Sequence, residues 1–103
     1  MATSKEFLNF VLESFDPSDG VTARAMMGEY CLYRQGVLFG GLYDGRVLVK
    51  ITENNAQFCM PTAIPYNGAK PMYFVDADDR ELMREVARVT SEDMARVKSK
   101  KKN

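Results

Sequence analysis

Apolar side chains recur at helical spacing near the start of the chain. From Phe7 to Phe15 they follow the three-to-four-residue period of an amphipathic helix. Thr3 and Glu6 have the Thr-x-x-Glu spacing of a capping box, in which Thr3 caps the helix and Glu6 reaches back to it. The pattern predicts a helix from about Ser4 to Phe15. A turn is expected over residues 16–20, which contain proline and glycine.

Alternating polar and apolar positions predict an antiparallel meander in the middle of the chain. Asp44-Gly45 is the strongest signal, because a type I′ hairpin turn needs positive φ at both of its central residues. Gln35-Gly36 predicts a second hairpin, Gly28 a bulge or bend, and Gly40-Gly41 a bend or a close backbone approach. The strands expected between these points are 21–27, 30–34, 37–43 and 46–51.

The second half of the chain is less regular. Residues 52–59 predict a short helix, and residues 60–71 are expected to be mostly loop because they hold most of the prolines. Met72–Val75 predicts a fifth strand, and the carboxylates of Asp76–Asp79 suit the start of a terminal helix. Whether Thr90-Ser91 breaks that helix stays open. The predicted fold is α+β, an antiparallel sheet of about five strands with N- and C-terminal helices packed on one side.

The charge is unevenly distributed along the 103 residues, which suit a single domain. Residues 1–93 carry 9 basic and 14 acidic side chains, and the last ten residues carry 5 basic and no acidic ones. We expect a domain over residues 1–95 and a basic, frayed tail over residues 96–103. No apolar run approaches the ~20 residues of a membrane span, and the first residues do not resemble a signal peptide. A cytoplasmic protein is therefore expected.

The composition argues against catalysis. The chain has no histidine, so the commonest general base and metal ligand are missing. Cys31 and Cys59 are expected to be reduced and buried as core filler, with a redox role or adventitious pairing as the alternatives. The carboxylate pairs Asp78-Asp79 and Glu92-Asp93 stand at expected helix starts, where capping explains them. We predict no catalytic residue, no metal and no cofactor.

The run from Arg24 to Phe58 resembles the TfoX N-terminal domain family, also called TfoX/Sxy. The family's run is approximately Arg-x-Met-Phe-Gly-Gly-x-Gly-Leu-Tyr, then a turn with glycine, an apolar strand with phenylalanine and a strand ending in lysine. The matching residues here are Arg24, Met26, Gly28, Leu32, Tyr33, Gly36, Phe39 and Lys50, and further on Pro65-Tyr66 and Met72-Tyr73-Phe74. The chain departs from the run at Met27, Glu29, Cys31 and Leu48.

The resemblance, which covers about residues 5–95, implies a fold similar to the secretion-chaperone-like group. It also implies an association with regulation of natural competence, in which two-domain members act as transcription coactivators. Larger members add a C-terminal helical domain, and the resemblance implies a stand-alone copy without it. The expected role is a non-catalytic regulatory module that binds a protein partner. Transcription machinery and a second copy of the chain are the partners considered.

The family motif and the tyrosine positions nominate five binding residues: Arg24, Tyr33, Lys50, Tyr66 and Tyr73. Arg24 either lies on a solvated face, tied to an acid such as Glu29 or Glu53, or presents its guanidinium to a partner carboxylate or phosphate. Lys50 either discourages strand pairing at an edge or joins Arg24 in a basic site. The tyrosines either pack in the core and its rim or contact a partner. For the methionines at 26, 27, 60 and 72, core filling is favoured over an adaptable contact surface.

Two alternatives to protein binding stay open. The first is nucleic-acid binding through the basic tail, by Arg96, Lys98, Lys100, Lys101 and Lys102. The second is a small-molecule site around Arg24 and Lys50.

Overall fold

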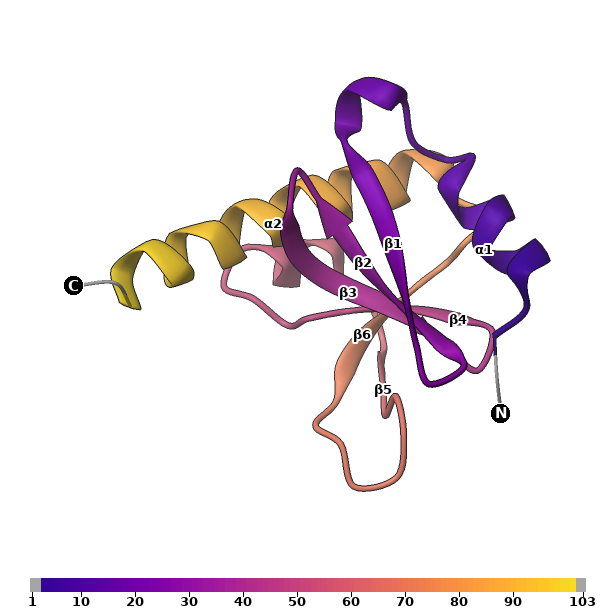
Figure 1. Ribbon diagram of the computed structural model, residues 1–103. Helices are drawn as coiled ribbons and strands as arrows, with labels where there is room; N and C mark the ends of the chain where they lie inside the picture. The colour runs from indigo at the N-terminus through magenta and orange to yellow at the C-terminus, as the bar shows by residue number, and fades with distance from the viewer. Residues whose placement is uncertain (1–2, 102–103) are drawn as a thin grey trace.

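The computed structural model describes the backbone of residues 3–101 and the side chains of residues 3–97. These residues form an antiparallel sheet of six strands with two α-helices (Figure 1). In chain order the elements are α1 (Lys5–Leu12), the 3₁₀ helix η1 (Pro17–Asp19), β1 (Val21–Met26), β2 (Glu29–Arg34), β3 (Val37–Tyr43), β4 (Arg46–Val49), the 3₁₀ helix η2 (Asn55–Phe58), β5 (Thr62–Ala63), β6 (Met72–Val75) and α2 (Arg80–Lys101).

The strands follow the order β1-β2-β3-β4-β6-β5, and every neighbouring pair is antiparallel. Two-residue turns join the first four strands, and both residues of each turn have positive φ: Met27-Gly28, Gln35-Gly36 and Asp44-Gly45. The last two hairpins are confirmed. Of the bulge or bend expected at Gly28, the bend is observed: Met27 at φ 52° and Gly28 at φ 84° close a third tight turn.

The bounds of β3 and β6 agree with the prediction, and β1, β2 and β4 differ from it by one or two residues. Strand β5 was not predicted, because two residues inside a proline-rich stretch carry no readable alternation. Gly40-Gly41 is a close approach, as expected. A Cβ on Gly40 would lie 2.3 Å from the Leu48 carbonyl oxygen, so only glycine fits there.

Helix α1 is shorter than predicted, and its cap is a different residue. Ser4 is the N-cap, since its hydroxyl accepts a hydrogen bond from the Phe7 amide at 3.1 Å. The Thr3 hydroxyl instead donates to a carboxylate oxygen of Glu29 at 2.6 Å. The expected capping box was therefore wrong, because a tertiary contact uses the threonine.

Both helices pack on one face of the sheet, as predicted. Leu8 and Val11 of α1 join Met83, Val86 and Ala87 of α2 in one core cluster. The sheet contributes Leu32, Phe39, Leu42, Val47, Val49 and Val75 to the same cluster. Side chains alternate along a strand, so the residues between these point to the opposite face.

Helix α2 is continuous through Thr90-Ser91. Both polar side chains are buried and satisfied without breaking the helix: the Thr90 hydroxyl accepts a hydrogen bond from Asn55 at 2.9 Å, and the Ser91 hydroxyl donates to the Arg88 carbonyl at 3.0 Å. Asp79 caps the first turn by accepting from the Leu82 amide at 3.1 Å, in line with the acidic stretch expected there. Neither described helix has both the length and the apolar composition of a membrane span.

Candidate functional site

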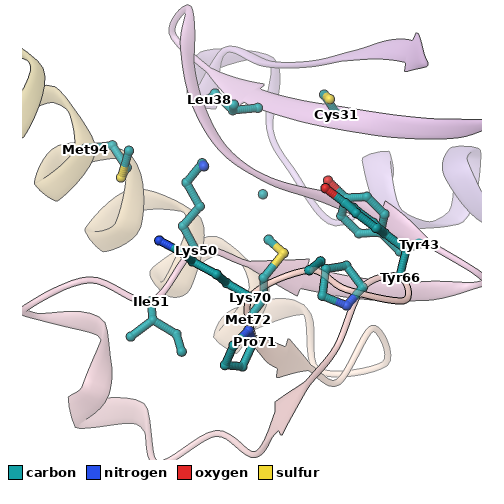
Figure 2. A pocket seen from close by; sticks show the side chains of 13 residues that line it. Cys31, Leu38, Tyr43, Lys50, Ile51, Tyr66, Lys70, Pro71, Met72 and Met94 are labelled. Carbon is teal, nitrogen blue, oxygen red and sulfur yellow. The ribbon is translucent and has the colours of Figure 1, made fainter. Parts of the chain in front are cut away.

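A groove with a volume of about 570 Å³ lies on the sheet face opposite the helices (Figure 2). Cys31, Tyr43 and Lys50 line this face, each next in sequence to a core residue on the other side. We call it the open face. The segment Pro65–Met72 forms the opposite wall of the groove, and Ile51 and Met94 lie at one end.

Arg46 holds that wall against the sheet. Its Nε donates to the Tyr43 carbonyl at 3.1 Å. One terminal guanidinium nitrogen lies 3.2 Å from the Ile64 carbonyl oxygen and 3.4 Å from that of Pro65. The rings of Tyr43 and Tyr66 add a tilted contact with 6.2 Å between centroids. Although the wall has little regular structure, the sheet fixes its position.

Gly41 makes room for the Tyr43 ring. A Cβ on Gly41 would lie 2.9 Å from the edge of that ring and 2.6 Å from the Tyr30 carbonyl oxygen. Burial is the main influence that raises the pKa of the Tyr43 phenol above its usual 10.0, with smaller contributions from Cys31, Tyr66 and Glu29. The phenol is therefore a neutral hydrogen-bonding group at the floor of the groove.

A second hollow of about 390 Å³ continues from the tyrosines toward the β1–β2 turn. Met26, Met27 and Glu29 line it together with Tyr43 and Tyr66, which also line the first groove. Met27 is 98% exposed, Tyr66 64% and Met26 46%. Core filling was therefore the wrong expectation for Met26 and Met27, whereas Met60 is buried. Met26 ends β1 with its side chain on the open face, and Met27 lies in the tight turn that follows.

Lys50 and Lys70 are the charged residues of the first groove. Among residues 3–97, neither forms an ion pair. The acid of the second hollow is already engaged: the Glu29 carboxylate accepts from the Thr3 amide at 3.0 Å, the Thr3 hydroxyl and the Asp44 amide at 3.0 Å. Neutral donors therefore hold the Glu29 carboxylate at the second hollow, and the two lysines place positive charge at the other end of the groove.

Buried hydrogen bonds fix the backbone of Lys50. The Lys50 amide donates to the Phe39 carbonyl at 3.0 Å, and the Lys50 carbonyl accepts from the fully buried Asn55 amide group at 2.7 Å. Asn55 also accepts from the Thr52 amide at 2.9 Å. This asparagine, which sequence reasoning missed, joins the end of β4 to helix α2 through Thr90.

Arg24 lies on the open face but does not line the groove. Its Cα partner is Cys31, and its side chain is exposed. Within the described side chains it pairs with neither Glu29 nor Glu53. Three strand spacings separate it from Lys50, which places the two backbones roughly 15 Å apart. The structure therefore does not bring the two residues together in the groove.

The other candidates divide between surface and core. Tyr66 lines both hollows, and Tyr33 is half-buried on the open face opposite Leu38. Tyr73 packs against the core cluster. In the tail, Arg96 forms an ion pair with the buried Asp93. The side chains of Lys98, Lys100, Lys101 and Lys102 lie outside the described residues.

The cysteines have different environments. Cys31 is buried at 9% exposure, and its Sγ lies 3.9 Å from the Met26 sulfur. Cys59 is exposed, so core filling was the wrong expectation for it. It ends η2 as the C-cap, in the left-handed conformation at φ 53°. No three acidic or thiol side chains in the described part of the chain are grouped to hold a metal ion.

Comparison with known proteins agrees with the resemblance in the motifs. The model of the TfoX N-terminal domain matches residues 13–94, which include all six strands. A protein of Spirochaeta aurantia, named only as an uncharacterized 12.7 kDa protein in the trpE 5′ region, is 33% identical over 95 residues. The alignment covers 88% of this chain and 83% of that relative. The chain therefore belongs to the TfoX N-terminal domain family.

Proposed function

We propose that the domain is a non-catalytic regulatory module of the cytoplasm that binds another protein through the open face of its sheet. The observation that carries the proposal is the gathering of exposed apolar side chains on that face. Met26, Met27, Ile51 and Tyr66 are all at least 46% exposed, and all line the two connected hollows. Exposed apolar side chains that gather in this way mark interaction sites, and methionine and tyrosine are enriched in them.

The same face offers little for catalysis. Its thiol, Cys31, contacts the Met26 sulfur and has no hydrogen-bonded base among the described side chains. The neutral Tyr43 phenol and the two lysines suit binding better than proton transfer at neutral pH. These features support a binding role.

The family's association with competence regulation supports a partner in transcription control. A second copy of the chain is the alternative occupant of the open face. Measurement of molar mass by light scattering over a concentration series separates the two, because self-association through this face would be lost in a variant that places a charge at Met27.

Affinity capture from native lysate tests the proposal. The intact chain is expected to enrich a reproducible set of proteins that Met27→Asp/Tyr66→Ser does not enrich. Both positions are exposed, so the variant is expected to fold. The control Asn9→Asp places a charge at an exposed position of α1, on the other side of the sheet, and should capture the same proteins as the intact chain. Equal capture by all three chains would contradict the assignment of this face.

Nucleic-acid binding is a second candidate, favoured by the course of α2. The helix continues to Lys101 and projects beyond the sheet (Figure 1), carrying Arg96, Lys98, Lys100 and Lys101. Binding of this kind should fall steeply with salt and disappear when residues 96–103 are deleted. Binding that persists in the truncated chain would exclude the tail as its source.

A further inference from the structure

We propose that the groove on the open face binds an extended segment of a partner protein in which acidic side chains stand next to apolar ones. Carboxylates would lie at Lys50 and Lys70, and apolar side chains would contact Met26 and Met27. The inference rests on the proposed function, because it uses the same face, and it adds the chemistry of the partner.

The two ends of the groove differ in character. In Figure 2 the lysines lie on the side of Met94, and Tyr43 and Tyr66 lie on the other side. Beyond the tyrosines the surface continues to the two exposed methionines. A ligand that fills the whole groove therefore meets ammonium groups at one end and thioethers at the other, with aromatic rings between them.

Two lysines without an ion-pair partner among residues 3–97 gather at this end of the groove, on a molecule that is acidic over residues 1–93. Residues 1–93 carry 14 acidic side chains against 9 basic ones. Elsewhere, arginines of α2 are neutralised by acids: Arg84 pairs with Asp16 and Asp19, and Arg88 pairs with Glu85. Lys50 and Lys70 have no such partner within residues 3–97, so a ligand carboxylate meets uncompensated charge there.

The groove has the dimensions of a short peptide. Met26 is at the end of β1 and Lys50 follows β4, so their backbones lie roughly 20 Å apart by strand spacing and rise. An extended chain covers that span with about six residues. The groove is open along the surface, which suits a polypeptide passing through it better than a ligand that must be enclosed.

A nucleic acid fits this surface less well. Interfaces with nucleic acid are strongly positive, because each phosphate contact needs a cation. Here methionine, leucine, isoleucine and proline form much of the lining, and Arg24 lies outside it. The observations favour an acidic peptide over a phosphate backbone.

Selection from a displayed library of random peptides of about ten residues, long enough to span the groove when extended, tests the chemistry directly. The intact chain is the target, and Met27→Asp/Tyr66→Ser is used for counter-selection. Enriched sequences should combine aspartate or glutamate with large apolar residues. Enrichment of neutral or basic sequences, or no enrichment over the counter-selected variant, would overturn the proposal.

A charge exchange locates the acidic end. Lys50→Glu/Lys70→Glu should weaken binding of the selected peptide, measured by fluorescence anisotropy, by roughly three- to tenfold, and a peptide with its acids changed to lysine should recover part of the loss. The control Lys5→Glu/Arg80→Glu changes the net charge equally at exposed helix positions and should bind like the intact chain. Equal weakening in both variants, or tighter binding of oligothymidine than of the peptide by the intact chain, would overturn the proposal.

The two proposals fail separately. If capture depends on Met27 and Tyr66 but the library yields neutral peptides, the proposed binding function stands and the acidic partner is excluded. If the Met27→Asp/Tyr66→Ser variant captures the same proteins as the intact chain, the proposed function of this face is excluded, whatever the library selects.

Discussion

The two faces of the sheet are built from alternate residues of the same strands, yet they differ in what covers them. On the helix side, Leu32 and Leu42 are fully buried under α1 and α2. At the open face, Met27 of the β1–β2 turn and Tyr66 of the loop are 98% and 64% exposed beside the groove. The first face gains its stability from burial. The second leaves apolar surface in water, which costs the isolated domain free energy that a partner covering this face would recover.

The largest expected effect separates the faces by stability. Leu42→Ala should lower the free energy of unfolding by roughly 2–5 kcal/mol, because it leaves a cavity in the core cluster. Met27→Ala should change it by less than about 0.5 kcal/mol, because the side chain is already solvated. Urea denaturation followed by circular dichroism measures both. Comparable losses at the two positions would mean that Met27 is covered in solution.

Asn55→Ala tests the buried connection between the end of β4 and α2. It should lower the free energy of unfolding by about 2–3 kcal/mol. The change leaves the Thr52 amide and the Lys50 carbonyl without their partner in a buried site. Denaturation measures the loss, and the exposed Asn67→Ala serves as the control. If its stability equals that of the control, water replaces the asparagine side chain, and solvent has access to the end of β4.

Much of the helix-covered face was predictable from the sequence. Asp44-Gly45 and Gln35-Gly36 placed the hairpins, and the alternation from Val37 to Tyr43 placed β3 with the bounds observed. These signals are local, since a turn or a strand depends on the φ preferences and polarity of a few adjacent residues. The acidic stretch before α2 was readable for the same reason.

The groove was not predictable, because its parts meet only in three dimensions. Lys70 stands in a segment without periodicity. Hydrogen bonds from Arg46 to the carbonyls of Ile64 and Pro65, 18 and 19 residues further along the chain, fix the start of that segment. Met27 reads as one more residue of a strand until the turn that exposes it is known. Thr3 reads as a helix cap because no local signal shows that Glu29 takes its hydroxyl.

Arg46→Ala tests whether the wall of the groove depends on the sheet. Three hydrogen bonds disappear, which should cost about 1 kcal/mol of unfolding free energy because the side chain is half-buried. The sharper readout is local. Hydrogen exchange should become faster in residues 64–71, while the helix-covered strands stay protected. Arg88→Ala on α2 is the control, and unchanged exchange in the loop would show that the tyrosine contact alone holds the wall.

The smallest expected effect appears only at high pH. The raised pKa of Tyr43 means that the folded chain holds its phenolic proton above pH 10, where the unfolded chain, with its ordinary pKa of 10.0, releases it. Below that pH the phenol is neutral in both states and its titration leaves stability unchanged. As pH rises through 10, ionisation of the phenol lowers the free energy of the unfolded state, so the protein becomes less stable. Unfolding followed from about pH 8 to pH 11 should therefore show a steeper loss of stability for the unmodified chain than for Tyr43→Phe. If stability falls equally with pH in Tyr43→Phe and in the unmodified chain, the phenol is solvated and water reaches the floor of the groove. A steeper loss would show that the floor is protected like the core, so that only the rim of the open face is left for a partner to cover.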